Sequence, residues 1–197
     1  MNRSVAPIAA ACIALAGAAM PAAAHEQIYV AALNGATENP ANASLGGGAG
    51  IVTFDLDLFT MRVQTTFAGL SGNVTASHIH CCIAAPGNVG VASQTPTFTG
   101  FPLGGNYGSY DHTFDMTLVS SYNASFINNN GGTPSTAFTA LLVGLDAGRA
   151  YLNIHSSFAP GGEIRGFLVP VPEPESYALM LGGLALVGWM ARRQRRA

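Results

Sequence analysis

The chain has 197 residues, of which 49% are hydrophobic and only 9% carry a charge. Residues 25–169 hold eight acidic and three basic side chains, a net charge of −5, and the whole chain contains no lysine. A chain without a basic patch has nothing to neutralise a phosphate backbone, so this composition excludes nucleic acid as a partner.

The first 24 residues predict a secretory signal. Arg3 supplies a positive start, residues 5–19 are almost wholly apolar, and Ala22-Ala23-Ala24 offers the small residues that signal peptidase needs. The apolar run is short for a membrane span and ends in a cleavage-type motif. We therefore expect a signal helix that is removed after Ala24, and an exported mature protein.

Residues 25–169 predict one β-rich domain, because turn signals separate short runs of β-branched and aromatic residues. Serine starts and glycine stops predict helices at 121–129 and 135–145. The predicted fold is mainly β, an antiparallel β-sandwich with one or two short helices. The expected strands are residues 27–33, 50–58, 61–67, 74–82, 112–118, 150–155 and 163–169.

The strand at 74–82 carries a His-x-His pattern. Side chains alternate between the faces of a strand, so His78 and His80 share one face and Ile79 takes the other. The same alternation gives the two last strands a polar face each. If these strands lie side by side, one face collects His78, His80, Asn153, His155, Glu163 and Arg165.

Two interpretations of this polar face stay open. Three imidazoles and a carboxylate can hold copper or zinc, with His78, His80, His155 and Glu163 as the ligands. Alternatively, the face is a hydrogen-bonded cluster with Asn153, in which Glu163 holds Arg165 or a histidine. In both cases we expect the three histidines to cluster. No nucleophile constellation or phosphate-binding glycine loop appears, so no catalytic residue is predicted.

Cys81 and Cys82 directly follow the histidine pair and are the only cysteines outside the signal, which contains Cys12. Adjacent cysteines in an oxidising compartment can form a vicinal disulfide. They can also remain thiols, or Cys82 can join the metal cluster, because it lies on the histidine face.

The end of the chain has three parts. Residues 170–175 contain three prolines and predict a stiff, extended spacer. Residues 176–191 hold no charge, and four arginines follow, which is a stop-transfer pattern with a cytoplasmic basic end. The apolar run is shorter than the roughly 20 residues that span a bilayer comfortably, so we expect a hydrophobic helix with temporary membrane anchoring. The arginines are Arg192, Arg193, Arg195 and Arg196.

With Pro172-Glu173-Pro174, the apolar run of residues 176–191 and the arginine cluster, the segment 170–197 resembles the PEP-CTERM sorting signal. The resemblance implies a Gram-negative source and processing by an exosortase in the inner membrane. It also implies a final location at the cell surface or in the extracellular matrix, often with extracellular polysaccharide.

Six blocks of the middle region carry a second resemblance: residues 33–40, 50–54, 70–72, 76–80, 148–155 and 160–166. In these blocks residues 25–169 resemble the CHRD domain, with one departure at Cys81-Cys82, where glycine and proline are expected. The resemblance implies an extracellular β-domain with no established catalytic activity. We expect no enzyme, and a domain that binds an unknown partner such as extracellular polysaccharide or another surface protein. Two functional hypotheses follow. One is a non-enzymatic surface or matrix protein, and the other is a copper- or zinc-binding protein, with redox activity as its boldest form.

Overall fold

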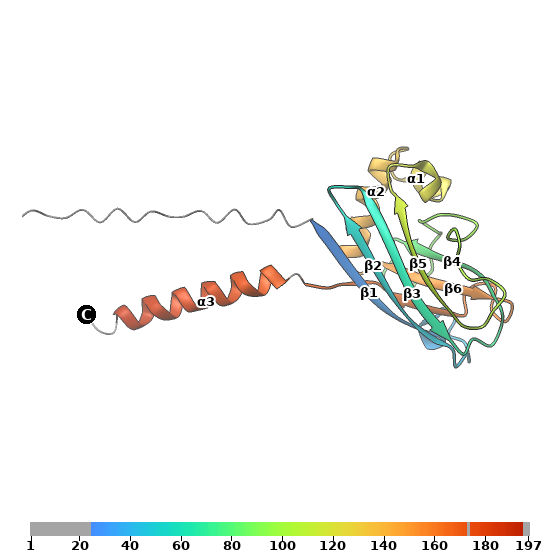
Figure 1. Cartoon of the computed structure of the whole chain (residues 1–197), viewed down its shortest axis with the longest axis horizontal. Helices are drawn as coiled ribbons and strands as arrows, with labels where there is room; N and C mark the ends of the chain where they lie inside the picture. Colours follow the sequence, from blue (N-terminus) through green and yellow to red (C-terminus); the bar gives the residue numbers. More distant parts are fainter. Residues whose placement is uncertain (1–24, 173, 195–197) are drawn as a thin grey trace, which may run out of the picture.

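The strands of the computed structural model form one antiparallel sheet that curls back on itself (Figure 1). The structure describes residues 25–172 and 174–194. The strands are β1 (Glu26–Asn34), β2 (Gly47–Asp55), β3 (Thr60–Ala68), β4 (Val74–Cys81), β5 (Gly108–Asp115), β6 (Ala150–Ser156), β7 (Ile164–Phe167) and β8 (Val169–Pro170). Their order across the sheet is β4-β6-β7-β1-β2-β3-β5, and β8 pairs with β1.

The predicted sandwich of two sheets is replaced by one continuous sheet, curled into a half-barrel. β7 makes the connection, because it pairs with β6 along its whole length and with β1 through Arg165 and Asn34. Both architectures bury one face of each strand, so the alternation in the sequence fits either of them. The sequence pattern therefore located the strands but did not distinguish one sheet from two.

The inner faces of β1, β2 and β3 form much of the core. Tyr29, Phe54 and Val63 are completely buried, while their strand neighbours point outward. Gly50 on β2 faces Leu152 on β6, and a Cβ at this glycine would collide with the leucine side chain. The two halves of the curl therefore pack closely against each other at this point.

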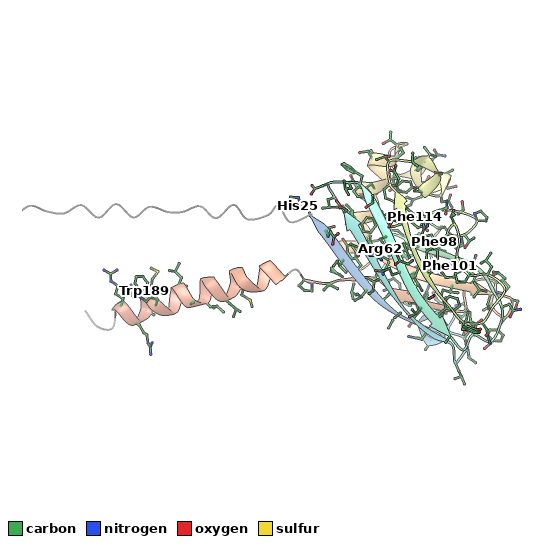
Figure 2. All side chains as sticks on the ribbon, viewed as in Figure 1. His25, Arg62, Phe98, Phe101, Phe114 and Trp189 are labelled. Carbon is green, nitrogen blue, oxygen red and sulfur yellow. A yellow bond between two sulfur atoms is a disulfide. The ribbon has the colours of Figure 1, made fainter. Side chains whose placement is uncertain are left out.

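The long loop between β4 and β5 is part of the core. Its Phe98 and Phe101 are buried, and Phe98 lies 5.3 Å, between ring centroids, from Phe114 on β5. Figure 2 labels these three rings within the sheet domain. Burying a phenylalanine contributes about 1.5–3 kcal/mol, so these rings hold the loop firmly on the sheet.

Two short α-helices cover one end of the curl, α1 (Ala124–Asn129) and α2 (Pro134–Asp146). Thr133 and Thr136 form a capping box at the start of α2, and Pro134 occupies the first turn, where its missing N–H costs nothing. Leu141 and Leu145 are completely buried against the sheet. Two short 3₁₀ helices complete the domain, η1 (Gly35–Thr37) and η2 (Val119–Ser121).

Most expected elements overlap the observed ones, and three differ. The strand expected at 112–118 is β5, which begins and ends several residues earlier. The helix expected at 121–129 is shorter and begins at Ala124, capped by the Asn123 side chain. The strand expected at 163–169 is divided into β7 and β8.

The C-terminal segment forms helix α3 (Pro174–Gln194), which extends away from the sheet in Figure 1. The tail led us to expect a transmembrane helix. However, no helix in the described part of the chain combines the length and the apolarity needed to cross a membrane. The expected signal helix at 1–24, together with Glu173, Arg195 and Arg196, lies outside the described residues.

Candidate metal centre

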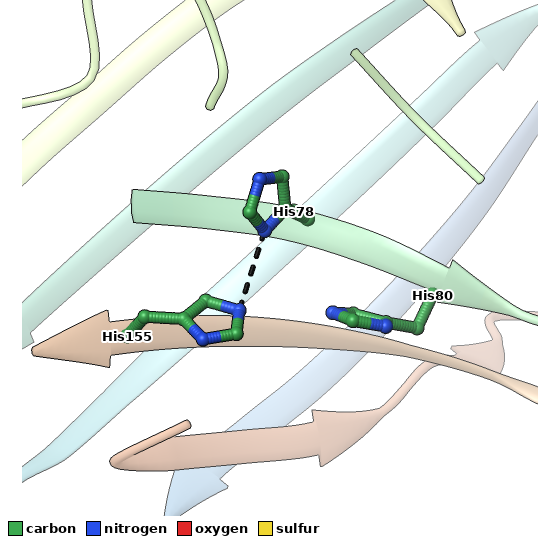
Figure 3. A group of neighbouring side chains, drawn as sticks. All are labelled: His78, His80 and His155. Carbon is green, nitrogen blue, oxygen red and sulfur yellow. Dashed lines mark hydrogen bonds between the residues drawn. The ribbon is translucent and has the colours of Figure 1, made fainter. Parts of the chain in front are cut away.

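Strands β4 and β6 bring three histidines together (Figure 3). His78 lies opposite Asn153, and His80 lies opposite Tyr151, so all four side chains share one face. His155 follows on the same face of β6. One ring nitrogen of each histidine lies within 4.8 Å of the other two, and His78 Nδ1 is 3.3 Å from His155 Nε2.

The remaining ring nitrogen of each histidine donates to a backbone carbonyl. A carbonyl can only accept, so these contacts fix the tautomer and leave the inward nitrogen as a free lone pair. Metal-binding histidines are held in the same way, by a hydrogen bond from the nitrogen that does not bind the ion. The contacts are His78 Nε2 to Pro96 O (2.6 Å), His80 Nδ1 to Val89 O (2.7 Å) and His155 Nδ1 to Pro160 O (2.8 Å).

Burial keeps these imidazoles neutral. It is the largest cause of a lowered pKa in all three histidines, and it brings the pKa of His80 to about 4. The backbone carbonyls act in the opposite direction but do not offset it. His80 Nε2 is buried and has no hydrogen-bond partner in the described structure. On the inward face, His78 Nδ1 and His155 Nε2 contact each other, whereas His80 Nε2 is an acceptor that lacks a donor among the described residues.

Arg165 on β7 supports the cluster from the neighbouring strand. Its guanidinium carbon lies 4.7 Å from the centroid of the Tyr151 ring, which in turn stacks on His80 at 4.7 Å. Only 1% of Arg165 is exposed, and its donors tie η1 and the loop after β4 to the sheet. That loop carries Val89, whose carbonyl orients His80. The acceptors of Arg165 are Thr37 O, Pro86 O, Gly87 O and Asn88 Oδ1.

The carboxylate beside the site is Glu38, which the sequence reasoning did not select. Its Oε1 accepts from Asn153 Nδ2 at 3.1 Å, and its Oε2 lies 3.7 Å from Arg165 Nε. Burial raises the pKa of Glu38 to about 7, against the opposing effects of Arg165 and Asn153. The only sequence signal was the position of Glu38 within the 33–40 block. The expected cluster of Asn153 and Arg165 therefore exists, with Glu38 as its acid.

Glu163 was expected to bind the ion or to counter Arg165, but the structure places it elsewhere. It precedes β7, and its buried carboxylate joins the turn after β6 to two other segments. Burial by itself would raise the pKa of Glu163, but the hydrogen bonds outweigh it and lower the pKa. The donors are Ser156 Oγ, Ser44 Oγ, Ser71 N and Gly72 N.

Cys81 and Cys82 are joined by a disulfide in the structure. Both sulfurs pack against Gly144 of α2, where a Cβ would collide with them. Because Cys82 Sγ lies against α2, it does not join the histidines. Within the described chain, the group that can hold a metal consists of His78, His80 and His155.

Two family models match the chain. The CHRD domain matches residues 29–168, and the PEP-CTERM protein-sorting motif matches residues 170–196. No curated protein and no solved structure matches it.

Proposed function

We propose that this chain, which belongs to the CHRD domain family and carries a PEP-CTERM motif, is an exported, non-enzymatic surface domain. We also propose that the domain binds a zinc or copper ion. The PEP-CTERM motif implies that the protein is exported and processed by an exosortase. The ion is held by His78, His80 and His155. The observation that carries this proposal is the convergence of three ring nitrogens, while the other nitrogen of each ring contacts a backbone carbonyl.

The spacing of the nitrogens supports a tetrahedral ion. Zinc-to-nitrogen distances of 2.0–2.1 Å separate two ligand atoms by about 3.3 Å. His78 Nδ1 and His155 Nε2 have this separation, and a ring nitrogen of His80 lies within 4.8 Å of both. Imidazole ligands suit zinc and copper, whereas magnesium and calcium prefer oxygen.

The composition of the site supports binding rather than catalysis. Two buried acids are engaged with other groups, Glu38 with Asn153 and Glu163 with serine hydroxyls. A bound ion with a free coordination position could contact a partner outside the cell. Extracellular polysaccharide and another surface protein are the two candidate partners.

Metal binding is the first test. Calorimetric titration of the purified mature protein with Zn²⁺ and Cu²⁺ should show one ion per chain. H80A should weaken binding by at least about 100-fold, because it removes a ligand rather than a supporting residue. H112A is the matched control, since His112 lies on β5 outside the cluster and its loss should leave the affinity unchanged. Absence of binding in the unmodified protein, or equal losses in the two variants, would contradict the proposal.

Removal of the sorting tail is the second test. Mass spectrometry of the protein released from its host should find polypeptides that lack Arg196-Ala197, because the PEP-CTERM motif implies processing by an exosortase. A variant with alanine in place of Pro172, Glu173 and Pro174 should retain the tail and stay with the membrane fraction. An intact tail on released, unmodified protein would show that this motif is not processed.

A further inference from the structure

Asn153 carries a second buried acceptor beside the histidines. It is 2% exposed, lies directly across from His78, and sits between Tyr151 and His155 on the same face of β6. Its Oδ1 has no hydrogen-bond partner in the described structure. An unpaired buried acceptor costs about 1–3 kcal/mol, so its presence indicates that a donor binds here.

The orientation of the Asn153 amide follows from its neighbours. Nδ2 donates to Glu38 Oε1 at 3.1 Å, and Arg165 lies beside the same carboxylate. Gly162, with φ of +135°, packs against the amide, and a Cβ there would lie 2.6 Å from Nδ2 and 2.9 Å from Oδ1. The amide is therefore held with its oxygen directed away from Glu38.

Two acceptors on one face thus lack donors, His80 Nε2 and Asn153 Oδ1. A zinc or copper ion satisfies the imidazole. It is a poorer match for the amide oxygen, because these metals favour nitrogen and sulfur ligands whereas amide oxygens suit harder cations. A hydrogen-bond donor attached to the ion would satisfy Asn153, and a zinc site with three protein ligands carries water at its fourth position.

We propose that the three-histidine site keeps an exchangeable water as its fourth ligand, that this water donates to Asn153 Oδ1, and that small exogenous ligands can replace it. This inference rests on the proposed metal site. His155 is only partly buried, whereas 7% of His78 and 8% of His80 are exposed, so small molecules approach from the His155 side. Asn153 selects among them, because a ligand that can donate a proton is stabilised by Oδ1 and an anion without one is repelled.

Azide binding to the Co²⁺-loaded protein tests the role of Asn153, since the visible spectrum of Co²⁺ reports exchange of its ligands. N153L removes the acceptor and should tighten azide binding by about tenfold, the equivalent of one hydrogen bond. N153D places a negative charge beside the ion and should weaken azide binding by a similar factor. N129L, on α1, is the matched control and should bind azide like the unmodified protein.

The outcomes separate the two proposals. Failure of the unmodified protein to bind Co²⁺ would remove the metal site itself. Equal azide affinities in the unmodified protein, N153L and N153D, with Co²⁺ bound in all three, would overturn the role of Asn153 and leave the metal site intact. A loss of Co²⁺ affinity of well over about 100-fold in N153L would make Asn153 a direct ligand, which also overturns the inference. If circular dichroism shows that N153L does not fold, the azide affinity of N153D relative to the unmodified protein decides whether Asn153 has the proposed role.

Discussion

Replacing Arg165 by methionine is expected to lower the free energy of unfolding by about 3–5 kcal/mol, because it leaves the buried Glu38 without its cation. The side chain also loses its bonds to η1 and to the loop that follows β4. The loss should be larger at pH 8 than at pH 5. Arg165 lowers the pKa of Glu38, so without it the ionised carboxylate is more strongly penalised. Urea denaturation of the metal-free protein at both pH values measures the effect.

Arg62 provides the matched control for Arg165. It also pairs with a carboxylate, Asp111, but on the outer face of the sheet, where the two side chains are 50% and 49% exposed. Exposed pairs contribute about 0–1 kcal/mol, so R62M should change stability by no more than that. If R165M and R62M destabilised the protein equally, Arg165 would not be needed to neutralise Glu38 and to hold η1 and the loop after β4 on the sheet.

Acidification is expected to lower the stability of the metal-free protein through His80, by about 3 kcal/mol between pH 7 and pH 4. The pKa of His80 is about 4 in the folded protein and near 6.5 in an unfolded chain. As the pH falls below 6.5, the unfolded chain binds a proton and the folded protein does not, so unfolding becomes easier until about pH 4. His78 and His155, whose pKa values are also lowered by burial, act in the same direction.

Glu38 opposes this trend, because its pKa is raised to about 7 and the folded protein therefore binds its proton first as the pH falls. The contribution of His80 is isolated by comparing the unmodified protein with H80Q in the presence of a chelator. From pH 7 to pH 4, the free energy of unfolding of the unmodified protein should fall by about 3 kcal/mol relative to that of H80Q. Parallel pH curves for the two proteins would show that His80 is not held in its neutral form.

The sequence predicted where the strands lie better than how they are connected. Alternating burial located β1, β2 and β3, because the pattern depends only on which face of a strand is covered. The change from a sandwich to one curled sheet depends on the pairing of β7 with β1, where Arg165 lies opposite Asn34. No local pattern reports a contact between residues so distant in the chain.

The same limit applies to the candidate site. The two-residue repeat correctly grouped His78 with His80, and Asn153 with His155, because all four lie inside regular strands. It misplaced Glu163, which precedes β7 at a turn where Gly162 has a positive φ and the alternation no longer holds. The carbonyls that orient the histidines come from loops, and a backbone carbonyl leaves no trace in the sequence.

The pairing of β8 with β1 brings the two ends of the sheet domain together. Tyr29 lies opposite Pro170, and Val171 N donates to Ile28 O at 2.8 Å, so the chain enters and leaves the domain side by side. Joining these ends with a short linker and opening the chain at the exposed turn near Leu58 would give a circular permutant. Such a permutant would keep every ladder of the sheet and the three histidines, and its new ends would lie beside the old N-terminal end, because Glu26 pairs with Asp55 and Leu56 N donates to His25 O.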